Sequence, residues 1–400
     1  MFASPTSAAT VTHALSPLAA DEFEDIVLLG VPFWGWQIAL AAVGVLALVL
    51  LARSIWNPTQ KSLRVWALGN IAVNAGIAVT GATVRVTSSG LGCSEWPQCT
   101  PDSFVPIDTG HAAFNAAIEF GNRTLTFLVL AVGVITLIAV ARMIPRRRDL
   151  FVMAAIIPFG VMGQAVVGGI TVWSNLHPAA VATHFLLSMV MVFITVALYV
   201  RLQEPEGKPQ LAAGPMLHAV SIGLVVVGFL LLVAGTVVTG TGPHGGDAAA
   251  PRWDLDLPAI TRVHSVLAWL TLLGSVMATA IAFRGGASRI VRTSSAALLV
   301  LVLLQGVLGY TQDALELPEA LVVLHVLGSA LTWIAIARLY FATTRLVPGG
   351  DKPGEETGTE PGDEPGAELT SAADRGGERS SAEPSAGSAE SGPAETSPGR

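Results

Sequence analysis

Long apolar stretches alternate with short polar segments along most of the chain. A helix that crosses a bilayer needs about 20 predominantly apolar residues, and nine stretches reach that length. A membrane β-barrel would instead have short segments of alternating hydrophobicity. The pattern therefore predicts transmembrane helices over about 33–53, 65–86, 117–141, 150–173, 179–200, 216–240, 260–283, 291–312 and 320–342.

The composition agrees with this pattern. Of 400 residues, 52% are hydrophobic and only 13% are charged, and the mean hydropathy is +0.61, which is too apolar for a soluble protein of this size. We predict an all-α polytopic membrane protein whose surroundings are the lipid bilayer. The sequence has no dinucleotide-binding glycine motif, P-loop or zinc-type Cys/His cluster, and we expect no nucleic-acid partner.

The chain contains an internal repeat. Its first copy has Gln164, Gly168 and His184, and its second copy has Gln305, Gly309 and His325, all three at one constant offset. One helix earlier, Asn122 aligns with His264 at an offset larger by one, and the segment 79–81 aligns with 238–240. The repeat predicts duplicated four-helix bundles, an eight-helix core, plus one extra N-terminal transmembrane helix.

This repeat divides the chain into five segments. We expect an external N-terminal segment over 1–32, the extra transmembrane helix over 33–53, a first four-helix half over 65–200 and a second over 216–342. The residues 347–400 are rich in Gly, Pro, Ser, Glu and Ala and lack apolar periodicity, which predicts a disordered tail. The tail is strongly acidic and accounts for the negative net charge of the whole chain, which is −7.

The distribution of basic residues predicts the orientation in the cell membrane, because short cytoplasmic loops retain Lys and Arg. Basic residues follow the first, third, fifth and seventh predicted helices, whereas the opposite loops are mostly acidic. The tail is then cytoplasmic and the N-terminus external. The basic positions are Arg53, Lys61, Arg64, Arg142, Arg146, Arg147, Arg148, Arg201, Lys208, Arg284, Arg289 and Arg292.

Both cysteines, Cys93 and Cys99, lie in one predicted external loop. Disulfides persist in that compartment, and the Gly and Pro residues nearby allow a short loop to close. We therefore expect a disulfide. A redox-active pair or two free thiols remain the alternatives.

Four predicted helices run in the same direction and have a polar landmark near the outer surface. The landmarks are Asn122, His184, His264 and His325. A neutral imidazole is a good axial ligand for haem iron, and two on facing helices can hold a porphyrin inside a bundle. The alternative is that each histidine is a buried polar residue bonded to a nearby carbonyl, but intramembrane ionisable groups are costly and tend to be functional.

Other charged residues lie near the same depth. Glu119 precedes Asn122 by three positions and Arg123 by four, so all three share a helix face. The carboxyl is a candidate catalytic group, an ion-pair partner of Arg123, or both. Arg85, Arg123 and Arg262 are candidate contacts for haem propionates, although extension to the membrane interface explains their positions equally well.

Three features resemble the haem A synthase family, whose members convert haem O into haem A for cytochrome oxidase, and they extend over about residues 65–342. One is Thr80-Gly-Ala-Thr-Val-Arg85-Val-Thr-Ser-Ser-Gly-Leu-Gly-Cys93-Ser-Glu-Trp96-Pro-Gln-Cys99. The second is Ile118-Glu119-Phe-Gly-Asn122-Arg123. The third is the pair of repeated halves containing His184, His264 and His325.

The resemblance implies roles for individual residues. In the second half, His264 and His325 would bind haem b. In the first half, His184 would bind the substrate haem O and Glu119 would act in the reaction. The family pattern usually reads Glu-x-x-His-Arg, whereas this chain has Asn122 where the histidine is expected, and Asn is a poor iron ligand. The description of the first half as a bis-imidazole site therefore does not carry over.

The activity implied is oxidation of one porphyrin methyl to a formyl by two successive hydroxylations and loss of water. The expected partners are haem O, the farnesyltransferase that produces it, and an electron-transfer partner that the sequence does not identify. Two rival hypotheses are a dihaem b-type electron carrier, which would need four histidines in two pairs, and a haem carrier or transporter, which would leave Glu119 without a task.

Overall fold

The computed structural model describes residues 27–28, 31–107 and 111–348. Nine α-helices occur in these residues, and each is long and apolar enough to cross a membrane. The prediction of nine transmembrane helices in an all-α membrane protein is confirmed. The helices are α1 (Phe33–Trp56), α2 (Gln60–Val86), α3 (His111–Ala141), α4 (Arg148–Trp173), α5 (Pro178–Arg201), α6 (Pro215–Thr241), α7 (Leu257–Arg284), α8 (Arg289–Ala314) and α9 (Glu319–Ala342).

Most helices extend a few residues beyond the apolar stretches, and side chains cap the N-termini of α2, α5 and α8. At the start of α2, the Thr59 side chain accepts a hydrogen bond from the Ser62 amide, and the Ser62 side chain accepts one from the Thr59 amide. At the start of α5, the His177 ring accepts a hydrogen bond from the Ala179 amide. Such caps satisfy N–H groups that have no partner within the helix.

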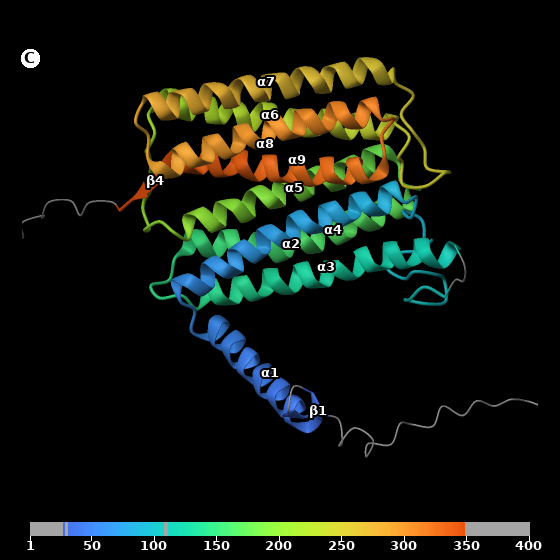
Figure 1. The fold of residues 1–400 in the computed structure, drawn as a ribbon, viewed down its shortest axis with the longest axis horizontal. Helices are drawn as coiled ribbons and strands as arrows, with labels where there is room; N and C mark the ends of the chain where they lie inside the picture. Colours follow the sequence, from blue (N-terminus) through green and yellow to red (C-terminus); the bar gives the residue numbers. More distant parts are fainter. Residues whose placement is uncertain (1–26, 29–30, 108–110, 349–400) are drawn as a thin grey trace, which may run out of the picture. The chain divides into compact units, whose positions relative to one another are not determined.

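The helices α2–α5 form one four-helix bundle and α6–α9 form a second (Figure 1). In each bundle the consecutive helices pack against one another, and the first also packs against the last. The two bundles meet where α9 contacts α2 and α5 and where α5 contacts α6. The helix α1 contacts α3 and α2, and none of its described side chains is buried.

The duplication extends to the backbone conformation of the loops. Asn175 and Leu176 follow α4 with φ of 50° and 60°, and Glu316 and Leu317 follow α8 with φ of 60° and 62°. These pairs occupy equivalent positions of the repeat. The Leu176 amide bonds the Thr171 carbonyl at 2.8 Å, and the Leu317 amide bonds the equivalent carbonyl of the second half, that of Gln312, at 2.7 Å. Both halves therefore reverse the chain with the same left-handed turn.

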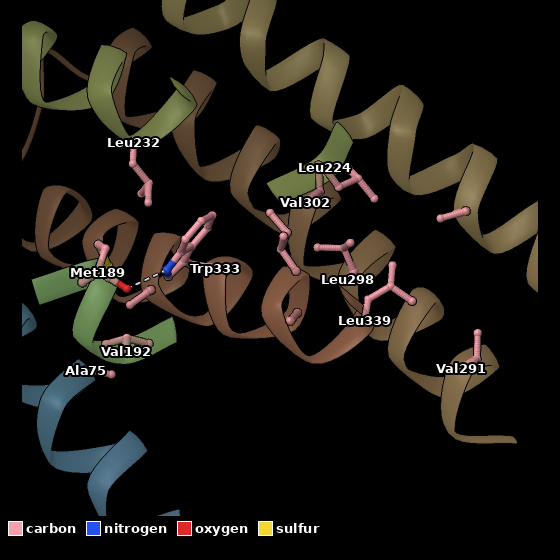
Figure 2. Packing of buried hydrophobic residues seen from close by; sticks show 14 of the residues in the cluster. Ala75, Met189, Val192, Leu224, Leu232, Val291, Leu298, Val302, Trp333 and Leu339 are labelled. Carbon is pink, nitrogen blue, oxygen red and sulfur yellow. Dashed lines mark hydrogen bonds between the residues drawn. The ribbon is translucent and has the colours of Figure 1, made fainter. Parts of the chain in front are cut away.

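A buried apolar cluster joins the two bundles (Figure 2). Trp333 on α9 is 3% exposed, and its indole N–H donates a hydrogen bond of 2.8 Å to the Met189 carbonyl on α5. Ala75 on α2 and Leu224 on α6 belong to the same cluster. Large apolar side chains elsewhere point outward, as on Phe127 and Val307, which is the distribution that a protein surrounded by lipid requires.

Two short antiparallel strand pairs accompany the helices. The strand β1 (Val27–Leu28) pairs with β2 (Val31–Pro32), and β3 (Lys208–Leu211) pairs with β4 (Thr344–Val347). The apolar pattern did not predict them. Most of the expected external segment 1–32 and nearly all of the expected tail 347–400 lie outside the described residues.

Candidate functional site

His264 and His325 face each other inside the second bundle. They lie on α7 and α9, and their ring centres are 6.4 Å apart with an angle of 61° between the ring planes. A metal–imidazole bond is about 2 Å long, so two imidazoles on opposite sides of one metal ion have ring centres roughly 6 Å apart. The pair therefore has the separation that a shared iron requires.

The histidine rings are also short of hydrogen bonds. Nδ1 of His184, His264 and His325 is buried, and among the described residues none of the three has a partner at hydrogen-bonding distance. A buried polar atom without a partner is uncommon, and it is usually explained by strain, function or a group that binds there. The unpartnered Nδ1 atoms show that the described residues do not satisfy these rings fully. The spacing of His264 and His325 is the observation that fits one iron held between two imidazoles.

The first bundle has one histidine at the corresponding depth. His184 lies on α5, and the Gln164 amide on α4 donates to its backbone carbonyl at 3.2 Å and to the Ser188 hydroxyl at 2.9 Å. On α3, Asn122 occupies the position that corresponds to His264. Its Oδ1 accepts a hydrogen bond of 2.7 Å from the Thr80 hydroxyl on α2. The first half therefore has an imidazole on one helix and an amide on its counterpart.

Glu119 is 5% exposed, and both of its carboxylate oxygens are bonded. The Cys93 amide donates to Oε2 at 2.7 Å, and the Arg123 guanidinium donates to Oε1, with Nε at 3.0 Å. The ion pair that the helix spacing permits, one of the two alternatives for Glu119, is therefore present. The bond to Cys93, which lies in a loop outside the helix, could not be read from the spacing.

Arg123 binds the loop that contains the two cysteines. Its Nη1 donates to the carbonyls of Glu95 at 2.7 Å and Gln98 at 3.0 Å, and its Nη2 donates to the carbonyl of Cys93 at 3.2 Å. Together with the bonds to Glu119, these contacts use all five N–H donors of a guanidinium. In this arrangement Arg123 has no N–H left for a propionate.

The cysteine loop lies at the end of the first bundle where α2 ends and α3 begins. Cys93 and Cys99 are joined by a disulfide, with Cα atoms 4.3 Å apart, and both residues are buried. Trp96 in this loop packs edge-on against Trp173 at the end of α4, with ring centres 5.5 Å apart. A methyl group on Gly169 of α4 would come within 2.6 Å of the Trp96 indole, so only glycine admits this contact.

The other two arginines differ in their surroundings. Arg85 at the end of α2 reaches the second half, where its guanidinium donates to the carbonyls of His244 and Thr239, the latter at 2.8 Å. Arg262 is exposed near the N-terminus of α7, 3.9 Å from Asp256. The structure thus places Arg85 between the halves and Arg262 at the surface.

The chain is similar to proteins of known family. The sequence model of a family described as cytochrome oxidase assembly protein matches residues 64–337. A "Heme A synthase" of Symbiobacterium thermophilum is 31% identical over 204 residues, which are 49% of this chain and 64% of that protein. A "Heme A synthase" of Halalkalibacterium halodurans is 31% identical over 135 residues, which are 33% of this chain and 43% of that protein. The matched segments thus span less than two thirds of either relative.

Proposed function

We propose that this chain, which belongs to the cytochrome oxidase assembly protein family, is a haem A synthase, a membrane oxidoreductase that oxidises one methyl group of haem O to a formyl group. The observation that carries the proposal is the pair of facing imidazoles in one half, combined with a different polar set at the same depth in the other half. The second half would then bind a permanent haem through its two histidines, and the first half would be the site where the substrate reacts.

In the second half, His264 and His325 would hold haem b. Their ring separation of 6.4 Å fits an iron between the imidazoles. When bound, haem b would supply one-electron transfer to and from the other half. Because both histidines would be used to hold the iron, this half would serve as a relay and not as the site of the substrate.

In the first half, His184 would bind the iron of haem O. Asn122 is a poor ligand for iron, and its oxygen already accepts the Thr80 hydroxyl. Glu119 would act on protons near the reacting methyl. A buried carboxyl that a substrate can approach is suited to proton transfer. Glu119 has a second task, since it also anchors the cysteine loop through the Cys93 amide. The disulfide loop with Trp96 would exclude water from the outer side of the site.

The proposed function also implies an orientation of the chain in the membrane and a set of partners. The ends of α2–α9 that carry the histidines would face outward, with the basic loops and the tail in the cytoplasm. The substrate would come from the farnesyltransferase that makes haem O. The reaction converts CH₃ to CH₂OH and then to CH(OH)₂, which loses water to form the formyl group. Each hydroxylation inserts one oxygen atom. With water as the oxygen source the electron-transfer partner would accept two electrons per step, and with dioxygen it would donate two electrons per step while one water forms.

Expression in a host that makes haem O but has no haem A synthase of its own tests the proposal. We expect haem A in the extracted haems, separated by chromatography, and none from host membranes without the protein. If only haem O is recovered from folded, haem-loaded protein that has a working electron partner, the chain is not a synthase. A dihaem electron carrier or a haem transporter would give that result.

A further inference from the structure

Each of the three histidine rings lies against a glycine of the preceding helix. A methyl group built on Gly168 of α4 would come within 3.5 Å of Cε1 of His184. On Gly235 of α6 it would come within 3.3 Å of Cε1 of His264, and on Gly309 of α8 within 3.5 Å of Cε1 of His325. Each glycine therefore provides the room that an imidazole ring occupies against the neighbouring helix.

The fourth glycine of this set has no ring against it. Gly76 on α2 corresponds to Gly235 in the same register that aligns 79–81 of α2 with 238–240 of α6, and Asn122 corresponds to His264. A methyl group on Gly76 would meet no atom of the described chain within 4 Å. Beside Gly76, therefore, no described side chain fills the space that an imidazole ring fills beside the other three glycines.

Asn122 is held at the edge of this space. Thr80 is one turn beyond Gly76 on the same face of α2. Its hydroxyl lies 2.7 Å from Asn122 Oδ1 and 3.1 Å from the Ile77 carbonyl of its own helix, so the shorter contact is the one to Asn122. In the second half the equivalent Thr239 hydroxyl donates to the Gly235 carbonyl of its own helix at 2.6 Å. Because the amide oxygen of Asn122 accepts the Thr80 proton, its NH₂ group, which can only donate, is the end that remains for a ligand.

We propose that Gly76, Thr80 and Asn122 form a subsite for a small neutral ligand with a lone pair, between water and imidazole in size. The subsite would lie on the face of the first-half haem opposite His184, with Asn122 as a hydrogen-bond donor and Thr80 as the residue that positions it. This inference rests on the proposed function, since it requires haem in the first half. It adds an exogenous-ligand site that the second half, with His264 in the same room, cannot have.

Titration of the purified, haem-loaded protein with imidazole, followed by optical absorption, tests the subsite. We expect imidazole to convert the first-half haem from high-spin to low-spin. The haem b of the second half should not respond and serves as an internal reference. In Gly76→Val the added methyl groups occupy the ligand's room, so we expect imidazole to bind at least about tenfold more weakly.

Gly81→Val is the matched control for the first substitution. Gly81 is on the same helix, also has no described atom within 4 Å of a built methyl, and points roughly 140° away from Gly76 around the helix axis. Imidazole should bind this variant as it binds the unmodified protein. For the positioning role, carbon monoxide on the reduced protein is the probe, because its oxygen can still accept a hydrogen bond from the Asn122 NH₂ group when its carbon binds iron. Thr80→Val should shift the infrared C–O stretch of the first-half haem, and Thr80→Ser should restore it, because serine keeps the hydroxyl.

The outcomes separate this inference from the proposed function. Equal imidazole affinity in Gly76→Val and the unmodified protein, or a first-half haem that is already low-spin without imidazole, would overturn the subsite even if haem A is made. A protein that binds imidazole as expected but never converts haem O would leave the subsite standing and overturn the synthase proposal. A protein that takes up only haem b would overturn both.

Discussion

The imidazole rings of His264 and His325 lie 6.4 Å apart, although the two residues belong to different helices with α8 between them in the chain. Since α7 and α9 come from the same bundle, the contact forms entirely within the second half. The separation fits one iron between two imidazoles. The first half repeats the helices but has an amide, that of Asn122, in place of one imidazole.

The double substitution His264→Ala, His325→Ala should abolish the low-spin spectrum of haem b, because both axial nitrogens are lost. Each single substitution should remove the six-coordinate signal. His177→Asn is a suitable control, since it removes an imidazole outside the bundle and keeps a side chain that can accept the Ala179 amide. A normal low-spin signal in the double variant would disprove the assignment.

Cys93 and Cys99 should be joined in the protein isolated from membranes. Mass spectrometry of a non-reduced digest measures this directly. Replacing both with serine should lower the free energy of unfolding by on the order of 2 kcal/mol, as expected for a short closed loop. Free thiols in freshly prepared protein would contradict the structural role and favour dithiol chemistry.

Glu119→Gln should preserve folding and the haem b spectrum but stop haem A formation, because an amide cannot take up and release a proton as a carboxyl does. Haem extraction and absorption spectra measure both effects. Haem A at the level of the unmodified protein would remove the carboxylate from the mechanism.

A loop-anchoring role of Glu119 makes a different prediction. Arg123 holds the same loop through the Glu95 and Gln98 carbonyls, so Arg123→Gln would then reduce haem A formation as much as Glu119→Gln. The rate at which a membrane-impermeant reductant opens the disulfide reports on loop closure. If Glu119→Gln leaves this rate unchanged and still stops haem A formation, anchoring alone does not explain the effect.

Asn122→His should turn the substrate haem low-spin, because the new ring would have the room beside Gly76 that His264 has beside Gly235. The variant should also lose its response to added imidazole. Asn122→Gln, which supplies an amide but no imidazole, is the control and should stay high-spin. A bis-imidazole spectrum of the substrate haem in the unmodified protein would refute the assignment of a single protein ligand.

Trp333→Phe should lower the free energy of unfolding in detergent by about 1 kcal/mol, the usual contribution of one hydrogen bond, because it removes the bond to the Met189 carbonyl between the bundles. Trp269→Phe is the matched control. The Trp269 indole N–H also donates a hydrogen bond, of 3.1 Å to the Tyr310 hydroxyl, but this bond lies within one bundle and Trp269 is 58% exposed. Its replacement should therefore change stability by less than about 0.5 kcal/mol. An equal loss in both variants would show that the bond between the bundles contributes nothing specific.

The helices and the repeat were predictable from sequence because their signals are local. An apolar run of sufficient length identifies a transmembrane helix, and the constant spacing between the landmarks of the two copies, such as Gln164 and Gln305, identifies the duplication. The candidate site residues His184, His264 and His325 follow from the same alignment. The ion pair of Glu119 and Arg123 also follows, since residues four apart share a helix face.

Contacts between distant segments were decided only by the tertiary structure. The Cys93 amide bonds Glu119 across a loop, the Thr80 hydroxyl bonds Asn122 from another helix, and β3 pairs with β4, which follows the last helix. No periodicity encodes such partners, because they depend on how the helices rotate and cross when they pack. The open room beside Gly76 is of this kind. In the sequence Gly76 is a glycine like its equivalents, and only packing places a ring against three of them and none against the fourth.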